Sequence, residues 1–390
     1  MVAIANVHNT HTEYYGWRVT AVSSFCTSGE SLQMGKFATA SNALDRVGDR
    51  LNQVRRLGLE RHLRHHEAVR GAEVKLGDRW LVNFSSNDYL GLAQHPDLKA
   101  AAIAAVSQYG TGSGASRLVT GSSHLHHQLE TAIARWKNTE DAIVFNSGYQ
   151  ANQGDLVGLS KGGDAIFFDS LSHASLRDGV TLSRAEALEF PHNNVEALEA
   201  LVRSHPSRGL KLIVTESVFS MDGDLSPLAA LLDLAERYDC LLVVDEAHGV
   251  GVFGQNGAGV CAHLNLKSPR LIQVGTCGKA LGSFGAYVAC CRPVADLLRN
   301  RARSFIYTTA LPSAAIAATH AAIALLQTNP EPQRNLWRNL KHLRSRLNLD
   351  LASQICPLII GDARRAVEIS DRLLDLGFWV QAIRPPTVPH

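Results

Sequence analysis

The sequence predicts an α/β fold with a mostly parallel central sheet and a smaller α+β domain after it. Through the middle of the chain, short apolar runs rich in Val, Ile and Leu alternate with longer amphipathic segments, which is the pattern of strand–helix units. A proline-bearing stretch at 329–332 then interrupts the alternation. A chain of 390 residues is long enough for both domains.

We divide the chain into four parts: an irregular extension (1–43), a basic helical segment (44–85), the large α/β domain (86–330) and part of the small α+β domain (331–390). In the large domain we expect strands at 142–145, 165–168, 210–215, 241–245, 271–275 and 286–290, with helices such as 228–238 between them. In the small domain we expect helices at 333–349 and 363–376 and strands at 356–360 and 379–383.

The composition excludes several classes of protein. A net charge of +2 provides no field for nucleic acid or a membrane surface, and no apolar run has the length of a membrane span. Residues 1–20 lack the pattern of a secretory signal. Seven cysteines without a Cys-x-x-Cys pair fit the reducing cytoplasm. The histidine clusters at 62–66 and 124–127 match no metal-ligand pattern, and we interpret them as solvated surface.

Three polar features follow predicted strands. Asp245 ends the run at 241–245, Lys279 follows the run at 271–275, and Ser147-Gly148 follows the run at 142–145 and opens a helix. Ligands of open α/β sheets collect at the carboxyl ends of the strands. Each feature alone is weak evidence, but together their order and spacing fit a site for pyridoxal phosphate.

The chemistry of that cofactor makes distinct demands. A buried carboxylate such as Asp245 keeps the ring nitrogen protonated, and His248, three residues on, could bond the ring hydroxyl. A desolvated Lys279 can supply the amine that condenses with the aldehyde. The N–H groups of a helix start at Ser147, Gly148 and Tyr149 suit the phosphate.

Two alternative phosphate sites fit the sequence less well. The pattern Gly-x-x-x-x-Gly-Lys-[Ser/Thr] does not occur. The glycine-rich stretch at 110–117 follows a helical pattern rather than a strand, so we expect a loop on the substrate or cofactor side of the site rather than a dinucleotide fingerprint.

Five longer segments point to one family. The stretches at 85–92 (SSNDYLGL), 110–117 (GTGSGASR), 171–175 (LSHAS), 218–224 (VFSMDGD) and 245–249 (DEAHG) all resemble those of the α-oxoamine synthases, which are fold-type I, pyridoxal-phosphate-dependent transferases. The resemblance covers nearly the whole chain from about residue 45.

The resemblance implies a homodimer with shared sites and a role for each residue. Lys279, His173, Asp245 and Ser220 should be catalytic: Lys279 linked to the cofactor, His173 stacked on its ring, Asp245 at the ring nitrogen, and Ser220 with His248 near the ring hydroxyl. Thr276 should lie near the phosphate, Thr308 and Thr309 should reach the phosphate of the neighbouring subunit, and Asn87 should lie close to the substrate. Two simpler interpretations stay open, Ser220 as a turn residue and His173 as a helix start.

Within the family, the segment 382–389 (AIRPPTVP) resembles the branch that joins L-alanine to a pimeloyl thioester in biotin synthesis. That branch implies a contact from Arg61 to the distal carboxylate, although a solvated helix face over 55–64 is the alternative. The acyl carrier, coenzyme A or an acyl carrier protein, stays open. Sister branches use glycine with a short acyl-CoA, or serine with long acyl chains.

Relatives continue for a few tens of residues beyond the position of His390, including a strand with an arginine for the amino-acid carboxylate. We therefore expect the small-domain strands at 356–360 and 379–383 to lack a neighbour. We also expect weak activity, with a truncated, cofactor-binding chain as the alternative to an active enzyme.

Overall fold

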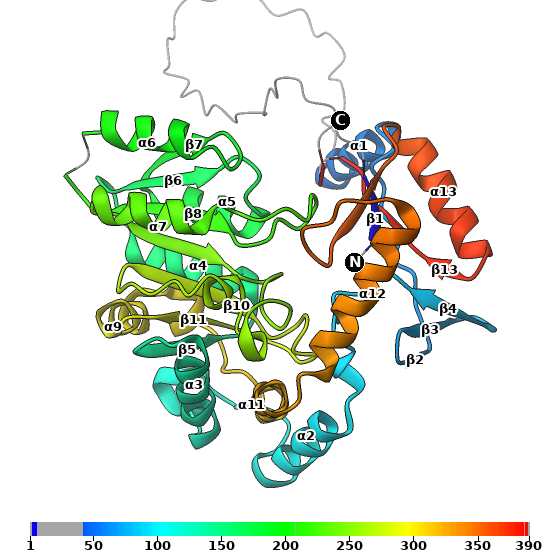
Figure 1. Cartoon of the computed structure of the whole chain (residues 1–390), viewed down its shortest axis with the longest axis horizontal. Coiled ribbons are helices and arrows are strands. Elements are labelled where there is room, and N and C mark those ends of the chain that lie inside the picture. Colours follow the sequence, from blue (N-terminus) through cyan, green and yellow to red (C-terminus); the bar gives the residue numbers. More distant parts are fainter. Residues whose placement is uncertain (1, 6–41, 207, 386, 389–390) are drawn as a thin grey trace, which may run out of the picture.

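The computed structural model describes residues 2–5, 42–206, 208–385 and 387–388. Its main element is a seven-stranded sheet in the order β5-β11-β10-β9-β8-β6-β7 (Figure 1). The strands are β5 Asp141–Phe145, β6 Ala165–Asp169, β7 Glu186–Phe190, β8 Lys211–Glu216, β9 Leu241–Asp245, β10 Leu271–Thr276 and β11 Ala286–Cys290. The pairings from β10 to β7 are parallel, whereas β11 runs antiparallel to both neighbours. The prediction of an α/β fold with a mostly parallel sheet is confirmed.

Helices cover both faces of this sheet. They are α2 Pro96–Tyr109, α3 His124–Lys137, α4 Gly148–Leu159, α5 Ala174–Ser183, α6 Val195–Ser204, α7 Leu228–Arg237, α8 Val260–His263, α9 Arg292–Arg301, α10 Arg303–Ile306 and α11 Ser313–Thr328, with short turns η1 Leu92–Gln94, η2 Arg117–Gly121 and η3 Gln255–Gly257. Apolar side chains of α4, α5 and α9 form one core, and those of α3, α6, α7 and α11 pack on the other face. Successive residues of β5, Ile143 and Val144, enter opposite cores because strand side chains alternate.

The sequence prediction missed β7. Its five residues, Glu-Ala-Leu-Glu-Phe, include one buried side chain, Phe190. The strand lies at the edge of the sheet beside β6, so it buries little apolar surface. A strand of this kind carries almost none of the hydrophobic signal by which strands are recognised.

The segment 44–85 is not helical throughout, so that prediction was wrong in its second half. Helix α1, Ala43–Arg56, is closed at its start by a capping box between Asn42 and Asp45. Three antiparallel strands follow, β2 Ala68–Arg70, β3 Glu73–Leu76 and β4 Arg79–Asn83. Their two-residue turns begin at Gly71 and Gly77, both with φ of +58°, which is the backbone that tight hairpins require.

The small domain contains α12 Glu331–Leu347, β12 Cys356–Ile359, α13 Ala363–Asp375, β13 Phe378–Trp379 and β14 Gln381–Ala382. The strand predicted at 379–383 is divided between two sheets, because β13 pairs with β4 while β14 pairs with β1. A short strand thus passes from one sheet to the other.

The start of the chain corrects two expectations. Val2–Ala5 forms strand β1, although we predicted an irregular extension over 1–43; residues 6–41 lie outside the described part of the chain. β1 lies between β12 and β14 and runs parallel to both, in the register Ile4 to Leu358 and Ile4 to Ala382. The small-domain strands therefore have a neighbour. β1 is distant from β12 and β14 in sequence but adjacent to them in space, and a pattern of four residues cannot reveal such a pairing.

Candidate active site

The polar groups predicted from strand ends gather at one edge of the sheet. Asp245 is the last residue of β9, and Lys279 follows the end of β10 at Thr276. The Lys279 Nζ lies 2.7 Å from the Nε2 of His248. Asp245 and His248 are 6% and 5% exposed, so the groups lie in a largely dry environment. Charge–charge interactions there are stronger than in water.

Burial changes the protonation of this cluster. It lowers the pKa of Lys279, while the carboxyl groups of Asp245 and Glu216 act in the opposite direction. Burial, followed by the charge of Lys279, lowers the pKa of His248 well below its ordinary value. A neutral amine is a nucleophile and a base, so the environment of Lys279 favours both roles.

His248 connects Lys279 to the predicted substrate residue Asn87. Its Nδ1 lies 2.6 Å from the hydroxyl of Tyr89, which lies 3.2 Å from the Oδ1 of Asn87. Gln354 donates to the carbonyl of His248 at 2.7 Å and fixes the backbone there. Tyr89 lies within the quoted segment 85–92, but the sequence assigned it no role.

The carboxylate of Asp245 is oriented by two donors. The Nδ2 of Asn152 donates to Oδ2 at 2.7 Å, and the backbone N–H of Ala247 donates to Oδ1 at 2.8 Å. The second N–H of Asn152 donates to the Oγ of Ser175 at 2.9 Å. The proton of the Ser175 hydroxyl is therefore available to His173, whose Nδ1 lies 2.7 Å away. Two predicted catalytic residues, Asp245 and His173, are thus linked through Asn152 and Ser175.

This arrangement fixes the tautomer of His173. The backbone N–H of Ser175 also donates to Nδ1, at 3.2 Å, so Nδ1 is an acceptor and the ring proton is on Nε2. Burial lowers the pKa of His173 and keeps the ring neutral, although Asp245 opposes this effect. His173 is the N-cap of α5, as the simpler interpretation of a helix start expects, while its stacking on the cofactor ring stays a prediction.

Glu216 also holds the backbone at His173. Its Oε1 accepts the backbone N–H of His173 at 2.6 Å. Burial, and then the neighbouring charge of Asp245, raises the pKa of Glu216 well above its ordinary value. The strand register explains the closeness, since Glu216 of β8 is paired with Asp245 of β9.

The start of α4 has the geometry of a phosphate cradle. Ser147 caps the helix by accepting the N–H of Gln150 at 3.2 Å. The N–H groups of Gly148 and Tyr149 belong to the first turn, where an α-helix has no acceptors of its own. A Cβ on Gly148 would lie 3.8 Å from the Oγ1 of Thr276, so the hydroxyl and the helix start face one space. These donors fit a phosphate, and with Lys279 and Asp245 the set fits pyridoxal phosphate.

The predicted intersubunit residues lie beside this cradle. Asn146, which precedes the Ser147 cap, donates to the Oγ1 of Thr308 at 3.2 Å and to the carbonyl of Thr309 at 2.7 Å. Thr309 also forms an antiparallel bridge with Ser116 of the glycine-rich stretch. That stretch is therefore a loop on the phosphate side, and the contact of the two threonines with a partner subunit stays a prediction.

Two predicted residues lie outside the cluster around Lys279. Ser220 is half-buried in the loop after β8, which is closed by the N–H of Phe219 donating to the carbonyl of Asp224 at 3.1 Å. Arg61 is exposed, and its guanidinium lies 3.5 Å from the Oγ1 of Thr387. It contacts the end of the small domain rather than the cofactor-side residues.

One histidine cluster was misinterpreted. His126 is 1% exposed rather than solvated, and its Nδ1 contacts the backbone N–H of Ser123 at 3.1 Å. Burial, and then the charge of Arg117, lowers its pKa to about 4.

The described part of the chain contains no helix long and apolar enough to cross a membrane.

Sequence reasoning missed four residues of the site, which are Tyr89, Asn152, Ser175 and Glu216. Asn152 lies one turn beyond Gly148 on α4 and points from the helix to the strand end. The signal that could have found it is a polar residue on the buried face of a helix whose start is already assigned to the phosphate. Ser175 lies within the segment 171–175, Glu216 directly follows the predicted strand at 210–215, and both are buried.

Comparison with known proteins agrees with this geometry. The family model of aminotransferase class I and II matches residues 79–390. A curated protein of Geobacter sulfurreducens, 8-amino-7-oxononanoate synthase, is 49% identical over 352 residues, covering 88% of this chain and 90% of its own. The protein of the same name from Pelobacter propionicus is 48% identical with the same coverage.

Solved structures show the same fold. A serine palmitoyltransferase from S. paucimobilis, with bound PLP and myriocin, is 29% identical with a TM-score of 0.81, covering 90% of this chain and 91% of that one. An 8-amino-7-oxononanoate synthase from Francisella tularensis is 31% identical with a TM-score of 0.66, covering 79% of this chain and 89% of that one.

Proposed function

Because this chain belongs to the class I and II aminotransferase family, and within it to the 8-amino-7-oxononanoate synthases, we propose that it joins L-alanine to a pimeloyl thioester in biotin synthesis. A bond forms between the alanine Cα and the thioester carbonyl carbon, and the carrier leaves as a thiol. The carboxyl group of alanine leaves as carbon dioxide, which gives 8-amino-7-oxononanoate. Pyridoxal phosphate is the cofactor.

The observation that carries the proposal is the contact between Lys279 and His248, 2.7 Å apart at the edge that also holds Asp245. Bound pyridoxal phosphate supplies a ring that accepts the electron pair left when the Cα–H bond breaks. Asp245, oriented by Asn152, holds the proton on the ring nitrogen that makes this possible. Lys279 removes the Cα proton of alanine, a role that its lowered pKa supports.

In the proposal, His173 donates a hydrogen bond to one of the substrates. Its Nε2 carries the proton because Ser175 occupies Nδ1 with two hydrogen bonds. An N–H at this position can bond the alanine carboxylate or the oxygen of the thioester carbonyl. The ring gives no lone pair at Nε2 in this tautomer, so the base remains Lys279.

In the proposal, the acyl chain extends towards the small domain. A cavity of about 340 Å³ lies between the segment after α1 and the small domain; Glu60 and His62, on either side of Arg61 in sequence, line it, whereas Arg61 itself does not. Its charged and polar walls include Glu60, Arg64 and Arg384. In the proposal, Arg61 binds the distal carboxylate of the pimeloyl group, and either coenzyme A or an acyl carrier protein serves as the carrier.

A homodimer with shared sites is part of the proposal. Leu118, Val119, Phe284 and Tyr307 are all more than half exposed, although they are large and apolar. Tyr307 precedes Thr308, and Leu118 follows the loop bridged to Thr309. Exposed large apolar side chains of this kind support the proposed interface. The proposal also places the protein in the reducing cytoplasm, a location that the free thiols of the described cysteines support.

The test is a condensation assay on purified holoenzyme with L-alanine and pimeloyl-CoA or the pimeloyl carrier protein, measuring product and carbon dioxide together. Glycine and serine compete in parallel, and we expect L-alanine to be preferred by about 10- to 200-fold, the range for one methyl group. Borohydride reduction followed by peptide mapping should attach the cofactor to Lys279. Attachment to another lysine, or a preference for glycine with acetyl-CoA, would contradict the proposal.

The shared site is tested separately by mixing two inactive variants. Lys279→Ala damages one site, and the double variant Thr308→Ala/Thr309→Ala should damage the phosphate contact in the partner's site. If sites are shared, mixed dimers regain one undamaged site and activity returns on mixing. Activity that stays absent after demonstrated subunit exchange would contradict sharing.

A further inference from the structure

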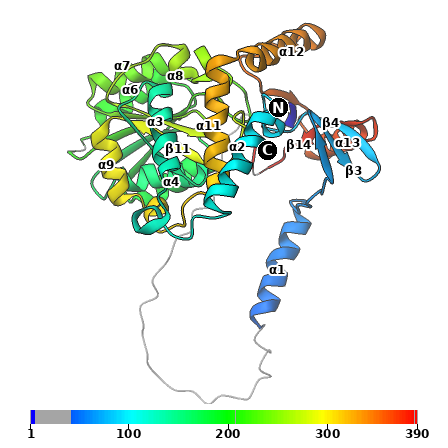
Figure 2. The ribbon, with the colours of Figure 1, turned by 90° about the horizontal axis from the view of Figure 1, so that it is seen from below.

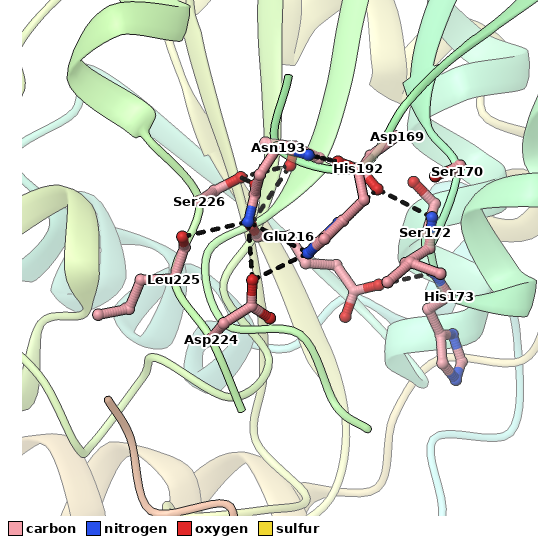
Figure 3. Close-up of polar contacts among 12 residues, drawn as sticks. Asp169, Ser170, Ser172, His173, His192, Asn193, Glu216, Asp224, Leu225 and Ser226 are labelled. Atoms are coloured by element: carbon pink, nitrogen blue, oxygen red, sulfur yellow. Dashed lines mark hydrogen bonds and ion pairs between the residues drawn. The ribbon is translucent and has the colours of Figure 1, made fainter. Parts of the chain in front are cut away.

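A second cluster of charges lies away from Lys279, around His192. Figure 3 shows the His192 ring between two carboxylates, with Nδ1 2.9 Å from Asp169 Oδ1 and Nε2 2.8 Å from Asp224 Oδ2. Ionised carboxylates accept hydrogen bonds and donate none. Both ring nitrogens must therefore carry protons, and the ring is an imidazolium bonded at both ends.

One carboxylate belongs to the segment that leads to His173, and the other to the loop that carries Ser220, a residue predicted to lie near the cofactor. Asp169 ends β6, and its Oδ1 also accepts the N–H of Leu171 at 2.8 Å, within the turn that leads to His173. Asp224 closes the loop that contains Ser220. His192 also meets the edge of Phe219, the residue before Ser220, with ring centroids 4.4 Å apart and planes at 88°. One side chain thus joins the two segments.

Asn193 repeats the connection. Its backbone N–H donates to Asp169 Oδ2 at 2.8 Å, and its Nδ2 donates to Asp224 Oδ2, also at 2.8 Å. The Nδ2 of Asn193 and the Nε2 of His192 lie 3.2 Å apart because both donate to the same oxygen. Asn193 has a φ of +54°, a conformation that asparagine tolerates better than most residues. The bridge is therefore built from two consecutive residues.

The surrounding charges favour the imidazolium. Burial alone would lower the pKa of His192, but Asp169 and Asp224 raise it to about 10. Asp222, on the same loop, has its own pKa raised by burial and by Asp224. Glu216 is the acidic group on β8, with a pKa raised by burial and by Asp245. The stabilisation from the raised pKa of His192 is present below its unfolded value and is lost as the pH rises through about 10.

We propose that His192 is a positioning residue for the reaction, which holds the turn ending at His173 and the loop carrying Ser220 in one fixed arrangement. The inference rests on the proposed function for the identity of the reaction. Displacement of a group by about 1 Å can cost about 10²-fold in rate. Loosening this bridge therefore lowers kcat rather than substrate affinity, and it disturbs the environment of the bound cofactor.

The main test replaces His192 by glutamine in the full holoenzyme. Glutamine keeps one amide donor but no charge, so the two carboxylates lose their shared cation. We expect kcat to fall by about 10- to 10²-fold, KM for L-alanine to change far less, and the visible circular dichroism of bound pyridoxal phosphate to change. His205→Gln is the matched control, since His205 also meets a phenylalanine edge, Phe167, and a carboxylate, Glu186, but joins no cofactor-side segments.

A second measurement needs neither turnover nor a variant that removes the histidine. Nuclear magnetic resonance of the cofactor-free protein should show His192 protonated on both nitrogens at pH 8. In Asp224→Asn, which changes the more exposed of the two carboxylates, the His192 pKa should fall. The high-pH limb of the kcat profile should move to lower pH in the same variant.

Two outcomes would overturn the inference: titration of His192 near its ordinary value in the cofactor-free protein, or a His192→Gln holoenzyme that matches His205→Gln in kcat and in the cofactor dichroism. Failure of the proposed function looks different, because the wild type would then bind pyridoxal phosphate without condensing alanine and a pimeloyl thioester. In that case the cofactor dichroism of His192→Gln and the titration of His192 still test whether His192 holds the two segments together.

Discussion

The strand ends around Asp245 and the helix α1 differ most in what determines their positions. Asp245, Asn152 and Ser175 are each buried to within 6% exposure, and their polar atoms bond to one another. Helix α1 has no buried residue, and it extends away from the body of the molecule (Figure 2). Its apolar side chains Leu44, Val47, Leu51 and Val54 nevertheless follow a helical spacing.

The difference separates two kinds of sequence signal. Around Asp245, each side chain is fixed by contacts within the chain, so a substitution there changes the chemistry or the stability of one subunit. In α1 no residue of the apolar stripe is buried against the rest of the described chain. We interpret it as surface for the second subunit of the proposed dimer. Substitutions of decreasing expected effect on the single chain test this contrast.

Asp245→Asn has the largest expected effect. An amide can still accept from Asn152 and bond the ring nitrogen, but it cannot keep that nitrogen protonated. We expect the free-energy barrier of the reaction to rise by several kcal/mol, and kcat falls about tenfold for each ~1.4 kcal/mol. The Kd for pyridoxal phosphate should change little. Asp239→Asn, which removes an exposed partner of Arg270, is the control. Turnover near the wild-type value would refute the role of Asp245.

The geometry around Asp245 also shows how far the sequence could predict the site. The strand ends at Asp245 and Thr276 were predictable because buried apolar runs end there. Asn152 was not, since it acts through the contact between α4 and β9, and the distance between two elements does not follow from either one. Quoted segments named His173, but its tautomer depends on the rotamer of Ser175.

The parts of the fold that escaped prediction share a cause. β7 and β1 are short strands whose pairing partners lie elsewhere in the chain. The turns at Gly71 and Gly77 depend on a positive φ rather than on an apolar period. Predictions from periodicity therefore succeeded in the two-sided core. They failed at the edge strand β7, at the two hairpins, and at β1, a four-residue strand that lies between partners distant in sequence.

Acid should destabilise the chain through His126. The unfolded residue binds a proton near pH 6.5, but burial holds the pKa of the folded residue at about 4. Stability is therefore lost as the pH falls from about 6.5 towards 4, by up to ~3 kcal/mol at ~1.4 kcal/mol per unit. Urea unfolding at pH 7 and pH 4.5 measures this loss. His126→Gln should reduce it, whereas His124→Gln, at an exposed position of the same helix, should leave it unchanged; equal losses in both variants would contradict the assignment.

Ser175→Ala should have a smaller effect. It removes the hydroxyl between Asn152 and His173 but keeps the backbone N–H that also donates to His173 Nδ1. We expect a stability loss of about 1–3 kcal/mol, the cost of a buried donor left without its acceptor, and a moderate fall in kcat. Ser107→Ala, at an exposed helix position, serves as the control. The role of Ser175 as the link between Asn152 and His173 would be refuted if the two variants behaved alike in both unfolding and turnover.

Substitution of the α1 stripe should affect the single chain least. Val47 and Leu51 are 60% and 43% exposed, so Val47→Ser/Leu51→Ser removes little packing within the subunit. We expect the free energy of unfolding of the isolated subunit to change by no more than about 0.5 kcal/mol, as for surface substitutions in general. If α1 contacts a second subunit, the same change should raise the dimer dissociation constant strongly, because the apolar area of the stripe is then buried only on association. Sedimentation velocity over a range of protein concentrations measures this constant, and the paired control Asp49→Ser/Gln53→Ser alters other positions of the same helix. Equal dissociation constants for the two double variants would show that the stripe lies outside the interface, and would leave the exposed residues beside Thr308 as the remaining contact surface.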